Sequence, residues 1–360
     1  MGNYIPPYTI SEKMLEQVSA ISEKVGKITS HRELESKPHL RRNNRIRSIH
    51  SSLKIEANSL SLNEVRDVIN GHLVIGDQKE IQEVKNAYAA YEKISEIDPS
   101  SAKQLKEIHG IMTHLTVEES GVFRKGDEGV FSGDKCIFVA PPPNMVSELM
   151  KDLLSWVKKY EGKVHPLIMA AVFHYEFVFI HPFADGNGRM ARLWHTVLLY
   201  RWRSVFEYIP LESQIERFQE QYYDAIAKCN TSGNSNIFIE FMLDMIDQVL
   251  DDVILQVNKA NAETSEYVKK MLDLMEYDVP YTSNDIMARL GLKSKETLRK
   301  NYKTALAQNP NNPKVLNNLR DGLPYPYTEK DAEVTMKEAL IINQKGCKKW
   351  HRVKNIWISF

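Results

Sequence analysis

The clearest signal in this chain is one string of twelve residues: His181-Pro182-Phe183-Ala184-Asp185-Gly186-Asn187-Gly188-Arg189-Met190-Ala191-Arg192. An apolar segment with helical spacing precedes it at 166–180, and a second buried helix is expected from 188 onward. The turn of Gly186, Asn187 and Gly188 is therefore expected at a helix N-terminus. The first backbone N–H groups of a helix lack helical partners and the dipole is positive there, so this turn can bind an anion such as phosphate.

The side chains around the turn suit phosphate chemistry. Asp185 offers a carboxylate to Mg²⁺, and Arg189 and Arg192, three residues apart, can bind phosphate oxygens in bidentate fashion. Histidine titrates near neutrality, so His181 can act as a general base. Together they predict transfer of a phosphoryl or nucleotidyl group to a hydroxyl. The alternative is a Gly/Asn turn with solvated charges, but chance occurrence of the whole string is below roughly 10⁻⁷.

The string matches at every fixed position the signature of the Fic (filamentation induced by cAMP) family, H-x-F-x-[D/E]-G-N-[G/K]-R-x-x-R, and the chain resembles that family over roughly 51–245. The resemblance implies a protein adenylyltransferase, which moves AMP from ATP to a Ser, Thr or Tyr hydroxyl of a target protein. It implies that His181 is the catalytic base, that Phe183 anchors the loop and that Asp185 holds Mg²⁺. It also implies an ATP site, with Arg192 on the γ-phosphate, made by Gly186, Asn187, Gly188, Arg189, Met190, Ala191 and Arg192.

A second segment is similar to the inhibitory helix of that family, [S/T]-x-x-x-E-[G/N]: Ser51-Ser52-Leu53-Lys54-Ile55-Glu56-Ala57-Asn58. Ser52 and Glu56 occupy the fixed positions, whereas Ala57 departs from the pattern and Asn58 follows one position later. A carboxylate delivered by Glu56 to Arg192 would compete with the γ-phosphate for one guanidinium. The resemblance thus implies an intramolecular brake of Ser52, Glu56 and Asn58. Taken alone, the segment reads as a solvated helical face.

A β-hairpin is predicted at 129–140, where two β-prone runs flank a Ser-Gly-Asp turn. In Fic proteins a hairpin at this place, the flap, clamps the target segment by strand addition. The resemblance implies that Phe138 and Val139 line this flap, and a plain surface hairpin is the alternative.

Two adjacent tyrosines fall where the family often has aromatic residues near the adenine of ATP. Tyr222 and Tyr223 are therefore expected at the nucleotide, with packing between helices as the equal alternative. Self-modification is also an expectation, because flap and loop hydroxyls such as those of Ser132 and Tyr222 can serve as targets.

The rest of the pattern is helical, which predicts a mainly α fold: a Fic helical bundle with one hairpin flap, followed by a small winged helix-turn-helix domain. Helices are expected at 10–27, 30–56, 62–69, 78–96 and 101–116, from 144, 166 and 188, and at 214–229 and 236–277. The expected domains are N-terminal helices at 1–100 with the inhibitory helix near 51–58, a Fic core at 101–250, a connecting helix at 251–277 and the winged-helix-like domain at 278–360.

The C-terminal part differs in charge from the rest of the chain. Residues 291–360 contain 14 lysines and arginines against 6 aspartates and glutamates, although the whole chain has a net charge of zero. Residues 283–302 have helix-turn-helix spacing, 309–318 is expected to be a loop, and Trp350 and Trp357 suggest a final strand pair. DNA can be bound through phosphate contacts by Lys293, Lys295, Arg299 and Lys300. The alternative is a domain for protein docking or homodimer formation.

Composition fits an intracellular enzyme. The chain has 360 residues, 42% hydrophobic and 26% charged, which is enough for a large core and two domains. Cys136, Cys229 and Cys347 share no close spacing, so a reducing cytoplasm without disulfides is expected. The sequence shows neither a signal peptide nor an apolar run that would cross a membrane.

Two other functions stay open. The same site can use another donor, such as UTP or CDP-choline, or can remove AMP from a modified target with Glu56 orienting a water. The chain can also be a DNA-binding regulator whose Fic core senses a nucleotide. The presence of His181 argues against that reading, because a sensor needs the anion site but has no use for a base.

Overall fold

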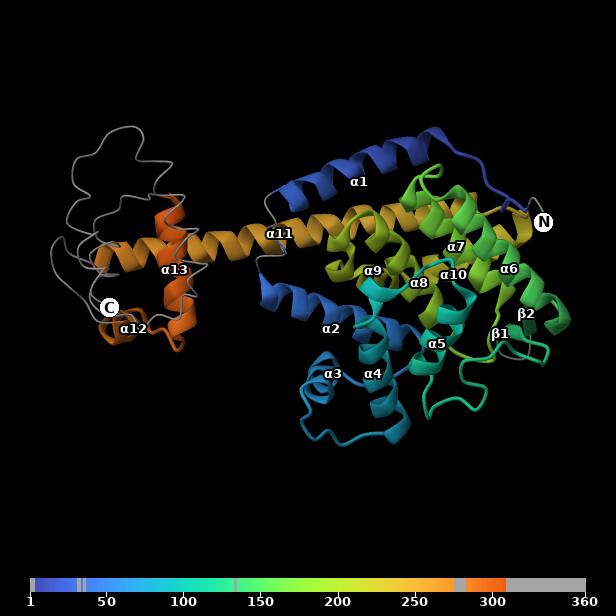
Figure 1. Cartoon of the computed structure of the whole chain (residues 1–360), viewed down its shortest axis with the longest axis horizontal. Coiled ribbons are helices and arrows are strands. Elements are labelled where there is room, and N and C mark those ends of the chain that lie inside the picture. Colours follow the sequence, from blue (N-terminus) through green and yellow to red (C-terminus); the bar gives the residue numbers. More distant parts are fainter. Residues whose placement is uncertain (1–3, 31–33, 35–36, 133–134, 275–282, 309–360) are drawn as a thin grey trace, which may run out of the picture. The chain divides into compact units, whose positions relative to one another are not determined.

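The computed structural model describes residues 4–30, 34, 37–132, 135–274 and 283–308. The mainly helical fold predicted from the sequence is confirmed (Figure 1). The chain divides into two compact units, Met1–Asn258 and Lys259–Phe360. No helix within the described ranges combines the length and the apolar character needed to cross a bilayer.

The first unit is a helical bundle around α7 (Pro166–Ile180) and α8 (Asn187–Trp202), which pack against each other (Figure 1). Helix α7 is apolar on all sides and almost entirely buried, as expected for a helix at the centre of a core. The surrounding elements are α1 (Glu12–Ser30), α2 (Pro38–Ile55), α3 (Leu62–Ile69), α4 (Gln78–Tyr91), η1 (Ile94–Glu96), α5 (Ala102–Met112), α6 (Pro143–Tyr160), η2 (Ser204–Tyr208), α9 (Leu211–Arg217), α10 (Gln219–Ser232) and the first part of α11 (Asn236–Leu274).

The predicted hairpin is present between α5 and α6. Strands β1 (Gly129–Ser132) and β2 (Lys135–Val139) are antiparallel, with Gly129 opposite Val139 and an irregularity between Val130 and Phe131. Among the described residues these two strands form the only sheet.

The second unit contains α12 (Ser283–Leu290) and α13 (Lys295–Gln308), joined by a short turn. Gly291 begins this turn with φ 64°, a left-handed conformation that glycine adopts without steric cost. The buried hydrophobic residues described in this unit are Val268, Met271, Ile286, Leu298, Tyr302 and Ala305. The expected loop at 309–318 and the strands near Trp350 and Trp357 lie outside the described residues, so the winged helix stays a prediction.

Several predicted helix boundaries were wrong. The helix expected at 30–56 is described only from Pro38, at its first position, where a proline costs no helical hydrogen bond. The helix expected at 214–229 is two helices, because Phe218 leaves the helical conformation between α9 and α10. Helix α4 ends at Tyr91, and α5 ends at Met112 shortly before Leu115, which has φ 60°.

Candidate active site

The loop between α7 and α8 begins at His181, whose backbone is left-handed with φ 52°. Its Nδ1 lies 3.4 Å from the carbonyl oxygen of Val178. A carbonyl only accepts, so Nδ1 carries the hydrogen and Nε2 keeps its lone pair. Burial is the main cause that lowers the pKa of His181, and the charge of Arg124 lowers it further. The Val178 carbonyl and the carboxylates of Glu56 and Asp185 act in the opposite direction and raise this pKa. His181 is thus a neutral imidazole with Nε2 able to accept a proton.

Two buried side chains hold the rest of the loop in place. Asn187 accepts a hydrogen bond from the Phe183 N–H at 2.9 Å and donates one to its carbonyl oxygen at 2.7 Å. The ring of Phe183 is fully buried. Both polar groups of the Asn187 side chain therefore serve the loop, which leaves its backbone as the part that can face an anion.

His109 of α5 is a supporting residue that sequence analysis missed. Its ring stacks on Phe183 with 3.6 Å between centroids and 5° between planes. Nδ1 accepts from the N–H of Gly121 at 2.9 Å, so Nε2 is the donor to the carbonyl oxygen of Asp185, also at 2.9 Å. Burial lowers the pKa of His109 to about 4, which keeps it neutral. No local pattern marks this single histidine among its apolar neighbours on the helix.

Two glycines stand at the start of α8: Gly186 directly precedes the helix, and Gly188 is its second residue. Gly186 has φ 81°, and a Cβ there would meet Thr113 Cγ2 at 3.1 Å. A Cβ on Gly188 would collide with Oε1 of Glu56 and lie 3.1 Å from a guanidinium nitrogen of Arg192. The carboxylate of Glu56 thus lies directly over the first turn of α8, where the free N–H groups and the dipole favour negative charge.

The two arginines of the motif have separate partners. Arg192 is 2% exposed. It donates to the Ser52 hydroxyl at 3.1 Å, to the Ser52 carbonyl oxygen at 2.9 Å and to Oε1 of Glu56 at 2.7 Å. Arg189 forms ion pairs with Asp185 at 3.2 Å and with Glu83 of α4 at 3.5 Å. Both residues expected at the outer phosphates are therefore held by carboxylates of the chain itself.

Glu56 ends α2, and the next residues fix its position. Ala57 has φ 65°, and the carbonyl oxygen of Ile55 accepts from Gln219 of α10 at 3.2 Å. Asn58 donates to the second oxygen of Glu83 at 2.9 Å and does not contact Arg192 among the described hydrogen bonds. Glu83, which sequence analysis did not single out, therefore joins the segment after α2 to Arg189.

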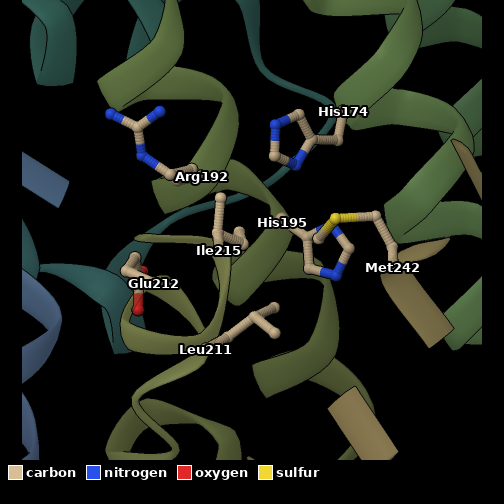
Figure 2. A pocket seen from close by; sticks show the side chains of 7 residues that line it. All are labelled: His174, Arg192, His195, Leu211, Glu212, Ile215 and Met242. Atoms are coloured by element: carbon tan, nitrogen blue, oxygen red, sulfur yellow. The ribbon is translucent and has the colours of Figure 1, made fainter. Parts of the chain in front are cut away.

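Next to Arg192 lies a small pocket that is lined by buried side chains and has no room for a water molecule. Figure 2 shows the side chains around it, which come from α7, α8, α9 and α11: His174, Arg192, His195, Leu211, Glu212, Ile215 and Met242. Glu212 accepts a hydrogen bond from the Tyr91 hydroxyl at 2.7 Å, and burial raises the pKa of its carboxyl. The buried arginine thus lies near a second carboxyl, that of Glu212, in addition to that of Glu56.

The tyrosines differ in exposure. Tyr222 is 2% exposed and its hydroxyl lies 2.9 Å from Nε2 of His174, so its contacts favour the packing alternative and leave no surface hydroxyl for self-modification. Tyr223 is half exposed. Met190 and Ala191 are fully buried, so only their backbone can approach a nucleotide.

The two residues expected to line the flap, Phe138 and Val139, also differ in exposure. The ring of Phe138 packs against Phe179 of α7 with 5.5 Å between centroids, whereas Val139 is 72% exposed. Ser132, the other expected site of self-modification, belongs to β1.

Asp185 is the residue that fits a Mg²⁺ ligand. Its side chain is 49% exposed, and one carboxylate oxygen accepts hydrogen bonds from Arg189 and from the Gly186 N–H. In the described part of the chain, no group of three or more His, Cys, Asp or Glu side chains could hold a metal ion. Mg²⁺ commonly takes one or two carboxylates together with substrate phosphates, and one half-exposed carboxylate beside an anion-binding helix end fits that pattern.

Comparison with known proteins agrees with this site. A model of the Fic/DOC family matches residues 99–199. A Fic family protein from Desulfovibrio desulfuricans G20 is 38% identical, with a TM-score of 0.68 over 85% of this chain and 92% of that chain. A Fic domain containing signaling protein from Bacteroides thetaiotaomicron VPI-5482 has the same fold at 18% identity, with a TM-score of 0.56 over 69% of this chain and 98% of that chain. The chain therefore belongs to the Fic family.

Curated relatives match a smaller share of their length. The protein named Protein adenylyltransferase Fic of Aedes aegypti is 32% identical over 216 residues, which is 57% of this chain and 41% of that protein. This chain thus spans about two fifths of the curated relatives it matches.

Proposed function

We propose that the chain is a protein adenylyltransferase that moves AMP from ATP to a Ser, Thr or Tyr hydroxyl of a target protein, and that Glu56 restrains it. The observation that carries this proposal is the position of the Glu56 carboxylate, 2.7 Å from Arg192 and directly over Gly188. A carboxylate there occupies the place that the site offers to phosphate oxygens.

The reaction follows from the residues around this place. Nε2 of His181 takes the proton of the target hydroxyl, and the hydroxyl oxygen attacks the α-phosphorus of ATP. The bond from that phosphorus to the bridging oxygen breaks, and pyrophosphate leaves toward Arg189 and Arg192. Backbone N–H groups at Gly186 to Gly188 stabilise the charge that develops on the α-phosphate oxygens. Mg²⁺ held by Asp185 would add positive charge at the phosphates when bound.

The brake acts through alignment. While Glu56 holds Arg192, the γ-phosphate cannot take the guanidinium, so a bound nucleotide is displaced and its α-phosphorus lies out of line with the attacking oxygen. Nucleotide can then bind without transfer. The exposed Val139 and the rest of the flap would present the target segment. Of the two tyrosines expected near the adenine, Tyr223 is the one whose side chain is exposed.

The test is intact-mass spectrometry after incubation with ATP and Mg²⁺. The variants are wild type, Glu56→Ala, Glu56→Ala/His181→Ala and the matched control Glu80→Ala, which removes a carboxylate that bonds Ser59. We expect addition of AMP to Glu56→Ala alone. Equal addition to wild type and Glu56→Ala would exclude the brake. Addition only with UTP or CDP-choline would favour another donor, and loss of AMP from a modified target would favour removal.

The basic second unit supports a further candidate, DNA binding. Helices α12 and α13 are joined by a four-residue turn, and Lys293, Lys295 and Lys300 are exposed. We propose the division into N-terminal helices, Fic core, connecting helix and C-terminal winged-helix-like domain at the boundaries expected above, with protein docking or homodimer formation as the alternative role of the last domain. Binding to a random duplex that falls steeply as salt rises would support phosphate contacts, and no binding at low salt would exclude them. The cytoplasmic location stays a prediction.

A further inference from the structure

Arg124 lies in the segment between α5 and β1, and it is 3% exposed. Four side-chain hydrogen bonds leave its guanidinium, and all of them end on backbone carbonyl oxygens. A planar guanidinium presents five N–H donors in a fixed fork, so one arginine can hold several chain segments at once. This buried charge belongs to no part of the nucleotide site described above.

One side of the fork caps the end of α7. Nε donates to the carbonyl oxygen of His181 at 2.6 Å, and a terminal nitrogen donates to that of Ile180 at 3.4 Å. The backbone N–H of Arg124 donates to the carbonyl oxygen of Pro182 at 3.0 Å. The last carbonyls of a helix have no helical partner and carry partial negative charge, so a cation is favoured there.

The other side of the fork holds both ends of the flap. One terminal nitrogen donates to the carbonyl oxygen of Gly126, before β1, at 2.8 Å. The other donates to the carbonyl oxygen of Pro141, after β2, at 2.6 Å. Next to these bonds, the N–H of Ala140 donates to the carbonyl oxygen of Glu128 at 3.0 Å. The two stems of the hairpin thus meet at the residue that also holds the loop of the base.

His181 needs such support because its backbone conformation is unfavourable. Its φ of 52° brings Cβ close to the backbone, a conformation that residues other than glycine rarely adopt. The surrounding hydrogen bonds must therefore select it over the alternatives. Arg124 provides the bond to the carbonyl of His181 itself, at the peptide that follows the left-handed residue.

We propose that Arg124 is a positioning residue that ties the flap to the catalytic base, so that the target segment and the imidazole of His181 keep one fixed relation. The proposal rests on the proposed function, since it takes His181 as the base and the flap as the target clamp. The side-chain hydrogen bonds of Arg124 end on backbone carbonyl oxygens, so it acts through the backbone of both elements.

Its charge also affects His181. The charged groups that face this imidazole are Arg124 from the preceding segment, Glu56 from the end of α2 and Asp185 from the loop. Burial is the main cause of the lowered pKa of His181. The charge of Arg124 lowers this pKa further, whereas the two carboxylates raise it. Removal of this charge is therefore expected to raise the pKa of the imidazole.

The experiment uses the full chain with Arg124→Lys, Arg124→Met and the control Arg203→Met, which removes an exposed arginine that also donates to a carbonyl. Hydrogen–deuterium exchange follows peptides that cover 126–141 and 178–183. NMR titration of labelled histidines follows His181, which His181→Gln assigns. Lysine keeps the charge but loses the fork, so the two variants separate geometry from charge.

For Arg124→Met we expect exchange about tenfold faster in both segments and a pKa of His181 that rises toward the ordinary value near 6.5. Arg124→Lys should show the faster exchange with a smaller rise in pKa. Faster exchange in only one segment, or unchanged exchange and pKa in both variants, would overturn the proposal. If Arg124→Met does not fold, Arg124→Lys alone decides between these outcomes.

A transfer assay separates this proposal from the proposed function. In the Glu56→Ala background, Arg124→Lys should leave ATP affinity unchanged and slow transfer by roughly 10²-fold. Exchange and titration need neither nucleotide nor target, so they still decide the role of Arg124 if Glu56→Ala transfers no AMP. If the Arg124 variants exchange faster in both segments but Glu56→Ala transfers no AMP, the proposed function alone is refuted. If Glu56→Ala transfers AMP but exchange does not rise in both segments, the role of Arg124 alone is refuted.

Discussion

Two residues of the candidate site, Ala57 and His181, carry a Cβ in a left-handed backbone conformation, with φ 65° and 52°. Ala57 directly follows Glu56, at the position after a helix end where glycine is common. The family pattern also has Gly or Asn there, so this chain keeps the conformation while lacking the residue that adopts it most easily. Both strained positions adjoin groups that we assign to catalysis or to its restraint.

Replacement of Ala57 by glycine should stabilise the protein. The left-handed conformation costs a residue with a Cβ about 1 kcal/mol, so Ala57→Gly is expected to raise the free energy of unfolding by about that amount. Urea-induced unfolding measures the change. The control is Ala20→Gly, at an exposed position within α1, where glycine should cost about 1 kcal/mol instead. A loss of stability in both variants would contradict the account of Ala57.

At the scale of elements, a chain of buried hydroxyl and carboxylate groups connects α2, α4 and α9 beneath Arg192. Arg192 donates to the Ser52 hydroxyl, the Tyr91 hydroxyl also meets Ser52, and Tyr91 donates to Glu212 at 2.7 Å. Ser52 and Glu56 thus hold the guanidinium of Arg192 together, Ser52 through its hydroxyl and its carbonyl oxygen and Glu56 through its carboxylate. Burial raises the pKa of the Glu212 carboxyl, whereas the nearby charge of Arg192 lowers it.

Tyr91→Phe should therefore destabilise the fold, because it leaves a buried oxygen of Glu212 without its donor. The expected loss in the free energy of unfolding is about 1–3 kcal/mol. Tyr88→Phe on the same helix is the control. Tyr88 is half-buried and its hydroxyl forms no hydrogen bond among the described residues, so a change below about 0.5 kcal/mol is expected. Equal losses in the two variants would show that the chain of groups is not coupled.

The elements also show how far sequence reasoning reaches. The string from His181 to Arg192 predicts a loop and a helix N-terminus correctly, because glycine turns and helical spacing are local signals. The break at Phe218 has no such signal, since no proline or glycine marks it. Arg124 and His109 were missed for a different reason: the loop carbonyls that they hold, those of His181 and Asp185, are 57 and 76 residues away, and no spacing rule encodes such contacts.

At the scale of the whole molecule, the core keeps several histidines neutral. Burial lowers the pKa of His195 on α8 to about 3 and lowers that of His174 on α7. A histidine in the unfolded chain titrates near 6.5. Below that pH the unfolded state binds a proton at each of these histidines that the folded state does not bind. The free energy of unfolding is therefore highest above pH 6.5, and it falls as the pH falls toward the pKa of the folded state.

His195→Leu should reduce this acid sensitivity. Between pH 6 and pH 4, the free energy of unfolding of wild type should fall more steeply than that of the variant, by about 1.4 kcal/mol per pH unit. Unfolding curves in urea at several pH values measure the two slopes. Parallel curves for wild type and His195→Leu would show that His195 is protonated in the folded state.

The close approach of the Glu56 carboxylate to Gly188 means that the residues at positions 56 and 188 should co-vary among homologues. A Cβ on Gly188 would collide with Oε1 of Glu56 where it now lies, so a side chain at 188 would displace this carboxylate from its place beside Arg192. Homologous lineages that acquire lysine at the position of Gly188 should therefore have lost the glutamate, or have shifted it, whereas those with glycine are free to keep it. Frequent co-occurrence of lysine and glutamate at these two positions in homologues would mean that the restraint tolerates a different geometry.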